Sequence, residues 1–109
     1  ALDLDNNKFY FGINGTWENS GDPTSGATGT GAKAIAAAST TPTGVWFPAV
    51  SDKHNSYNTT LDMNFGGGAA FGATAVASAN QDADGFGNFE FSVPSGYFSI
   101  CSKNLAEYG

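Results

Sequence analysis

Arginine is absent from this 109-residue chain, and histidine, cysteine and methionine each occur once. Four lysines stand against ten acidic residues, which gives a formal net charge of −6. Because so few cations cannot neutralise a row of phosphates, the composition argues against nucleic-acid binding and against attraction to an anionic membrane surface. No apolar run approaches the ~20 residues that cross a bilayer. The single cysteine, Cys101, cannot form an internal disulfide, so the fold must stand without a covalent cross-link.

Leucine and charged residues are also scarce, whereas phenylalanine and glycine are common. The chain has nine phenylalanines and 15 glycines, and charged residues make up 13% of it. This composition disfavours a helical bundle and favours short strands joined by turns. The length fits a single domain, residues 1–109.

Alternating patterns predict about six strands. Residues 1–13 form two alternating runs around Asp5–Lys8 and predict a β-hairpin, and Asn14-Gly15 is a second tight-turn signal. Further strands are predicted at 45–50, 57–65, 89–93 and 97–101. Long loops are predicted at 18–44 and 66–87, the first with an Ala-rich piece (32–38) that forms either one helical turn or a short edge strand. Six short antiparallel strands predict an all-β sandwich or barrel.

Strand parity also predicts which side chains form the core. One face of each predicted strand carries the large apolar residues, and we expect that face to be buried. The predicted core residues are Leu2, Leu4, Phe9, Phe11, Ile13, Val50, Leu61, Met63, Phe65, Phe89, Phe91, Phe98 and Ile100.

No constellation in the sequence predicts catalysis or a cofactor. The candidates for an acid–base pair are Asp82 with Asp84, or Asp3 with Asp5. Asp3 and Asp5 share one strand face, but both flank a hairpin turn, where Asp is favoured for its turn chemistry. Asp82 and Asp84 are weak calcium candidates, since Phe and Gly stand where further oxygen ligands should follow. His54 and Cys101 are too few for a zinc site. We therefore expect no enzyme activity, no metal and no cofactor.

Aromatic and polar loop residues carry the remaining binding signal. Trp17, Trp46 and Tyr57 stand near predicted loop junctions, as does Tyr10, and His54 and Asn55 lie in a polar loop. Such aromatic side chains stack on sugars or anchor protein interfaces, although core packing is the favoured interpretation for each Trp. The candidate ligand-binding residues are Trp17, Trp46, His54, Asn55 and Tyr57.

Five motifs in order resemble a known family. Residues 1–17 (ALDLDNNKFYFGINGTW) resemble the "A-L-D-L-D…N-G" hairpin of SPRY domains, and Asn19–Pro23 continues the resemblance to the family's phage and environmental members. Phe47–Val50 resembles a "Y-P-A-V" strand, and Asn64–Gly66 an "N-F-G" strand end. The stretch from Phe89 through Pro94–Tyr97 to Cys101–Leu105 is similar to the phage-type ending "F-x-Y-x-P-P-x-G-F…C-T-x-N-L".

This resemblance implies a bent, two-sheet antiparallel β-sandwich of the concanavalin-like jelly-roll type. Because SPRY domains place several strands before the hairpin, it also implies that the chain is the C-terminal part of such a domain, cut from a longer polypeptide. The implied function is a non-catalytic binding and assembly module of a tailed-phage or related virion, such as a tail fibre or capsid decoration. The implied partners are protein (neighbouring copies or the rest of the parent polypeptide) and a host-surface glycan or protein. A peptide-recognising SPRY adaptor and a glycan-active enzyme remain the alternatives.

Overall fold

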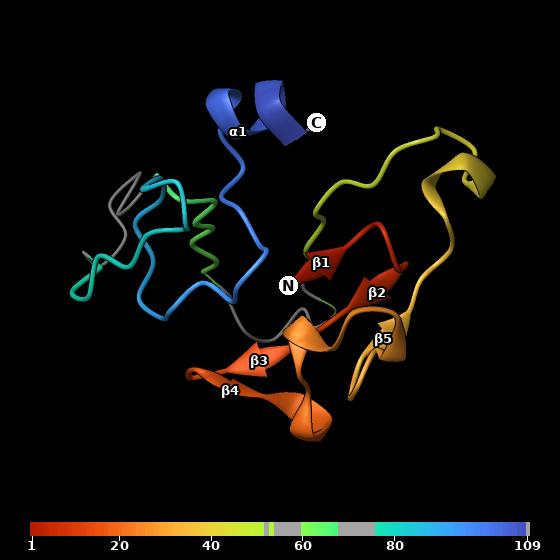
Figure 1. Ribbon diagram of the computed structural model, residues 1–109, viewed down its shortest axis with the longest axis horizontal. Helices are drawn as coiled ribbons and strands as arrows, with labels where there is room; N and C mark the ends of the chain where they lie inside the picture. Colours follow the sequence, from red (N-terminus) through yellow and green to blue (C-terminus); the bar gives the residue numbers. More distant parts are fainter. Residues whose placement is uncertain (52, 54–59, 68–75, 109) are drawn as a thin grey trace.

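The computed structural model describes residues 1–51, 53, 60–67 and 76–108 (Figure 1). Five two-residue strands form two small antiparallel sheets in this part of the chain, and one short α-helix follows near the C-terminal end. The elements are β1 (Leu2–Asp3), β2 (Lys8–Phe9), β3 (Gly12–Ile13), β4 (Thr16–Trp17), the 3-10 helices η1 (Glu18–Ser20) and η2 (Pro23–Thr28), β5 (Lys33–Ala34), η3 (Ala38–Thr40) and α1 (Ser102–Tyr108).

The predicted N-terminal hairpin is confirmed. β1 pairs antiparallel with β2, with Leu2 opposite Phe9 and Asp3 opposite Lys8. The Asp3 carboxylate stabilises the turn, because its two oxygens accept the backbone N–H and the side-chain amide of Asn6, both at 2.9 Å. Asn7 supplies the positive φ of 54° that the turn requires.

β5 extends this hairpin to three strands in the order β1-β2-β5. Lys8 lies opposite Ala34, and Phe9 lies opposite Lys33. Of the two predictions for the Ala-rich piece, the short edge strand is therefore confirmed. The predicted long loop at 18–44 contains this strand together with η1, η2 and η3.

The second predicted turn is confirmed as well. Gly12 pairs with Trp17 and Ile13 with Thr16, which makes β3 and β4 a two-stranded hairpin. Asn14 (φ 49°) and Gly15 (φ 77°) both adopt positive φ, as a type I′ turn demands.

The predicted face of residues 9–13 is not the buried one. Tyr10, on the opposite parity, is 2% exposed, whereas Phe11 and Ile13 are 57% and 63% exposed. Trp17 of β4 and the segment that follows it lie against Tyr10. The ring of Trp17 meets the Tyr10 ring edge-on at 6.5 Å between centroids, and a Cβ added to Gly21 would lie 3.6 Å from Tyr10 Cδ1.

The core prediction is wrong for most of its members. A strand buries one face only where another layer packs against it. Among the described residues these strands have no such facing layer, so their side chains remain exposed on both faces. Ten predicted core residues are exposed: Leu2, Leu4, Phe11, Ile13, Val50, Leu61, Met63, Phe65, Phe91 and Ile100. Phe9, Phe89 and Phe98 are half-buried.

The later predicted strands are also absent from the described residues. Residues 45–50 and 60–65 form no ladder, and 57–59 lie outside the described part. At 89–93 the pairing is limited to one antiparallel bridge between Asn80 and Phe89. Side chains bond to the backbone groups that would extend it, because Asn80 Nδ2 donates to the carbonyls of Phe89 and Glu90.

Residues 97–101 likewise form no strand. The backbone N–H of Ser99 donates to the carboxylate of Asp82, and the N–H of Cys101 donates to the Ser99 carbonyl. Helix α1, which the alternation did not predict, begins directly afterwards. Among the described residues no helix is long and apolar enough to cross a membrane. This part of the chain is a small β-rich fold with two antiparallel sheets.

Candidate functional site

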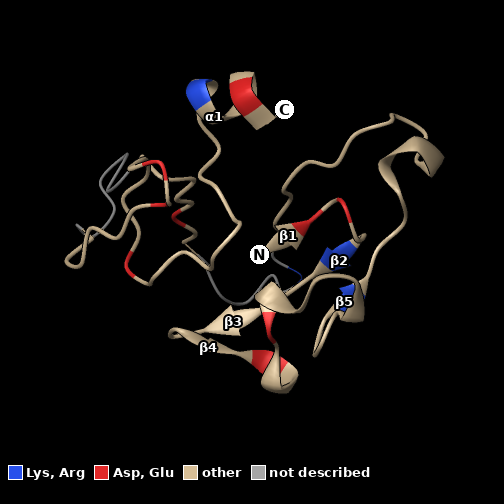
Figure 2. Cartoon of the chain, viewed as in Figure 1, with Lys and Arg blue, Asp and Glu red and all other residues tan. Residues whose placement is uncertain are grey.

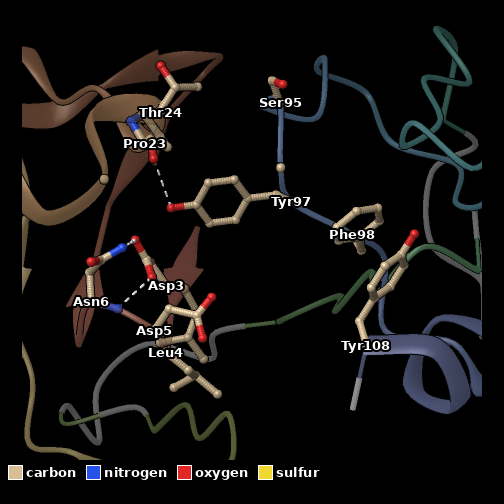
Figure 3. Close-up of a pocket in the computed structure, with 13 residues that line it drawn as sticks. Asp3, Leu4, Asp5, Asn6, Pro23, Thr24, Ser95, Tyr97, Phe98 and Tyr108 are labelled. Carbon is tan, nitrogen blue, oxygen red and sulfur yellow. Dashed lines mark hydrogen bonds between the residues drawn. The ribbon is translucent and has the colours of Figure 1, made fainter.

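A cavity of about 580 Å³ joins segments that are far apart in the sequence (Figure 3). The β1–β2 hairpin forms one wall, and the start of η2 forms a second. Residues 95–98 and Tyr108, the last residue of α1, form the remaining wall. The lining residues are Leu2, Asp3, Leu4, Asp5, Asn6, Pro23, Thr24, Gly26, Ser95, Gly96, Tyr97, Phe98 and Tyr108.

The hairpin wall carries two carboxylates with different surroundings. Asp3 is half-buried, and Asn6 occupies both of its oxygens. Asp5 is exposed, and its carboxylate lies on the side of the hairpin that faces Phe98 and Tyr108 (Figure 3). The two candidate acid–base carboxylates therefore have different surroundings. Asp3 stabilises the turn, and Asp5 presents its oxygens to the cavity.

Tyr97 spans the cavity toward η2 (Figure 3). Its hydroxyl donates to the carbonyl of Pro23 at 3.0 Å, a contact between residues 74 positions apart. Burial, followed by the negative charge of Asp3, raises the pKa of Tyr97 to about 12. The phenol therefore stays neutral at physiological pH and acts as a hydrogen-bond donor that connects η2 to the C-terminal segment.

Phe98 and Tyr108 form the aromatic wall. Their rings stack at 4.2 Å between centroids and 21° between planes. The Tyr108 hydroxyl donates to Asp84 Oδ2 at 2.9 Å, and this hydrogen bond is the main cause of the raised pKa of Tyr108. The end of α1 is thereby fixed both to the chain before it and to the 82–86 turn.

Asp82 fixes the backbone that carries Tyr97 and Phe98. Its Oδ2 accepts from Ser99 N at 2.9 Å, Ser99 Oγ at 2.7 Å and Asn104 Nδ2 at 2.9 Å. Its Oδ1 accepts from the backbone N–H groups of Asp84 and Phe86, at 3.1 and 2.9 Å. Burial alone would raise the pKa of Asp82, but these donors outweigh it and hold the pKa well below its ordinary value.

Of the predicted binding residues that the structure describes, Trp17 and Trp46, neither lines the cavity. Trp17 is half-buried and packs on its own hairpin, so that a Cβ added to Gly12 would meet its ring at 3.1 Å. Trp46 is 41% exposed, and its Nε1 donates to the Ala36 carbonyl at 3.2 Å. His54, Asn55 and Tyr57 lie outside the described residues.

The weak calcium candidates have other partners. Five donors surround the carboxylate of Asp82, and Asp84 accepts from Tyr108. N–H and O–H donors occupy both oxygens of Asp82 and Oδ2 of Asp84. Within the described ranges, no group of three or more His, Cys, Asp or Glu side chains is arranged to hold a metal ion.

Sequence reasoning missed Tyr97, Phe98, Asn104 and Tyr108 as a connected group. Tyr97 and Phe98 were assigned to a strand, and residues 102–108 were given no element. The missed signal is the run from Ser102 to Tyr108, which contains no Gly or Pro and begins at a small polar residue.

The chain matches no protein-family model, no curated protein and no solved structure.

Proposed function

We propose that this chain is a non-catalytic binding and assembly module of a viral structural protein, such as a tail fibre or capsid decoration. In this proposal its two small sheets belong to a larger two-sheet β-sandwich of the SPRY-like type. Neighbouring protein, either copies of the chain or the rest of its polypeptide, completes that sandwich. The loops of the module then contact a glycan or protein on the host surface, outside the membrane and on the surface of the particle.

One observation carries the assembly part of this proposal. Fifteen large apolar side chains are at least 41% exposed, and Tyr10 is the only buried hydrophobic residue of the described chain. The exposed residues include apolar side chains of both hairpins that the alternating pattern predicted to be buried. Leu2 and Leu4 are on the first hairpin, and Phe11 and Ile13 are on the second. Side chains patterned for burial and left uncovered are the mark of a surface that another protein covers.

The total area of these exposed side chains is comparable with that of a protein interface. An aromatic side chain can bury ~150–250 Å², and six aromatic residues are roughly half exposed: Phe11, Trp46, Phe47, Phe65, Phe91 and Tyr108. Covering them alone would remove roughly 600 Å² from water, and the aliphatic residues would add to it. A standard interface takes about 800 Å² from each partner.

The viral context rests on the SPRY resemblance and on the chemistry of the loops. The phage-type ending lies at 89–105, and residues 18–44 are rich in Gly, Ser, Thr and Ala, with little charge. Uncharged polar loops on a sheet framework suit contacts with sugars and protein surfaces. Of the two predicted ligand-binding residues that the structure describes, Trp46 is the more exposed.

Sedimentation velocity of the 109-residue chain across micromolar concentrations tests the assembly proposal. We expect concentration-dependent association, weakened in the double variant Phe11→Ser/Ile13→Ser. Thr16→Ser, on the partner strand of the same hairpin, is the matched control and should associate like the parent. A stable, soluble monomer over the whole range would contradict the proposal.

A further inference from the structure

The cavity between the β1–β2 hairpin and the Tyr97–Phe98 segment has an unbalanced charge. Asp3 and Asp5 line it, and none of the basic residues that the structure describes is among its lining residues. Lys8 and Lys33 are on β2 and β5, and Lys103 is on α1 (Figure 2); neither these nor Lys53 lines the cavity. The negative charge at this wall is therefore not matched by a cation of the described chain that reaches into the cavity.

Aromatic rings line the same cavity as these carboxylates. Tyr97, Phe98 and Tyr108 contribute three rings to the same cavity (Figure 3). A ring face attracts a cation within about 6 Å, and carboxylates bind the same cation by charge-assisted hydrogen bonds. The raised pKa of Tyr97, caused by burial and by the Asp3 charge, is consistent with a negative potential at this position.

Asp3 and Asp5 differ in the hydrogen bonds that their carboxylates already make. Asn6 already satisfies one lone pair on each oxygen of Asp3, so that Asp3 contributes mainly its charge. Asp5 makes no side-chain hydrogen bond to another described residue, and it faces the aromatic wall. Asp5 is therefore the residue able to accept new hydrogen bonds from a bound group.

We propose that this cavity binds the cationic side chain of a partner peptide, an arginine guanidinium or lysine ammonium, between Asp5 and the Phe98–Tyr108 pair. Leu2 and Leu4, which are 41% and 50% exposed at the same wall, pack against the aliphatic stem of that side chain. A volume of about 580 Å³ accommodates a long side chain together with part of its backbone. This inference goes beyond the assembly proposal and is tested separately, because the assembly test changes Phe11 and Ile13, which do not line the cavity.

Titration calorimetry of the 109-residue chain with the peptide acetyl-Gly-Arg-Gly-Arg-Gly-amide tests the proposal. The matched probe replaces arginine by citrulline, which keeps the shape and removes the charge. We expect the arginine peptide to bind, its affinity to fall with added salt, and the citrulline peptide to bind at least tenfold more weakly. Equal binding of the two peptides, or no binding of either at millimolar concentration, would overturn the proposal.

Two variants separate a specific site from the general acidity of the chain. Asp5→Asn should weaken binding of the arginine peptide by about tenfold or more, because it removes the charged acceptor. Asp62→Asn makes the same change of net charge at an exposed residue that does not line the cavity, and it should leave the affinity unchanged. Equal losses in both variants would show non-specific attraction and refute the site.

A third probe distinguishes the source of the cation. Glucosamine oligomers carry the same ammonium chemistry on a sugar, and their N-acetylated counterparts do not. We expect the arginine peptide to bind more tightly than the glucosamine oligomer, since only the peptide side chain has an aliphatic stem for Leu2 and Leu4. Tighter binding of the glucosamine oligomer would overturn the assignment to a peptide.

Discussion

Ser99 donates two hydrogen bonds to one carboxylate oxygen of Asp82, from its backbone N–H at 2.9 Å and from its hydroxyl at 2.7 Å. Asn104 donates a third to the same oxygen, at 2.9 Å. All three residues are buried, at 4–8% exposure. A single acidic side chain thus joins the 82–86 turn, the 97–101 segment and helix α1, and through them it positions the cavity wall formed by residues 95–98 and Tyr108.

Replacing Asp82 should destabilise the protein more than replacing its neighbour. Asp82→Ala leaves the N–H groups of Ser99 and Phe86 and the Asn104 amide without their acceptor in a buried setting, which is costly. Asp84→Ala loses one exposed hydrogen bond, from Tyr108. We expect a clearly lower urea midpoint for Asp82→Ala and a midpoint near the parent value for Asp84→Ala. Equal midpoints in the two variants would contradict the role given to Asp82.

The carboxylate of Asp82 also makes the free energy of unfolding depend on pH in the acid range. Because its pKa is lower in the folded chain than in the unfolded one, Asp82 stabilises the fold above about pH 4. This contribution is lost progressively as the pH falls from there toward the folded pKa. Asp22, whose pKa is lowered by hydrogen bonds from Thr24, acts in the same direction.

Urea unfolding of the parent and of Asp82→Asn, from about pH 7 to about pH 3, measures this term. We expect the free energy of unfolding of the parent to fall across the acid range and that of Asp82→Asn to fall less. Parallel curves for the two proteins would show that Asp82 is not responsible.

Tyr97 should ionise later than an ordinary tyrosine, because its burial and the nearby Asp3 charge raise its pKa. Its pKa is raised to about 12, against an ordinary value of about 10. Since the folded pKa is the higher one, the neutral phenol stabilises the fold below about pH 10, and this is lost as the pH rises toward 12. An ultraviolet titration of phenolate absorbance should show a late component that is absent in Tyr97→Phe. Persistence of that component in the variant would assign it to another residue.

Tyr10 should be the most sensitive single side chain in the described core. It is 2% exposed and lies beneath the segment that follows β4. Tyr10→Ala should cost about 3 kcal/mol, by analogy with other aromatic truncations in cores. Tyr10→Phe removes only a hydroxyl that lies 3.4 Å from Ser25 Oγ and should cost less than about 1 kcal/mol. Denaturant unfolding of both variants measures the difference, and similar losses in both would contradict the packing role of the ring.

Local chemistry explains which parts of the fold were predictable. Both hairpins follow from turn residues that tolerate positive φ, Asn7 at one turn and Asn14-Gly15 at the other. Strand pairing elsewhere depends on distant partners. Asn64 shows why alternation failed there, because its amide donates to the Asn88 carbonyl and its oxygen accepts from Gly66 N, side-chain bonds that stand where a backbone ladder was expected.

The cavity was not predictable for the same reason. Its connections join residues that are 17 to 74 positions apart, such as Asp82 with Ser99 and Pro23 with Tyr97. Sequence parity describes the two faces of one strand, but it does not state which segment will fold onto a face. Tyr10 demonstrates the consequence: its own parity was predicted to be the outer one, and the chain after β4 covers it.

Gly31 is the position where a single methyl group should disturb this covering segment. It adopts φ +68°, and an added Cβ would lie 2.5 Å from Gly21 Cα and 2.7 Å from the Asn19 carbonyl oxygen, both rigid backbone atoms. Gly44 has nearly the same φ, +71°, but has open space around it. Gly44→Ala should therefore cost only the strain of a left-handed residue, about 1–2 kcal/mol. Gly31→Ala should cost this strain plus the overpacking term, a further ~1–3 kcal/mol. The two variants are compared by their free energies of unfolding in denaturant. Because the strain of positive φ is common to both, the difference between them measures the close approach of the backbone at 19–21 to residue 31. Equal losses would mean that these two stretches of backbone do not pack against each other.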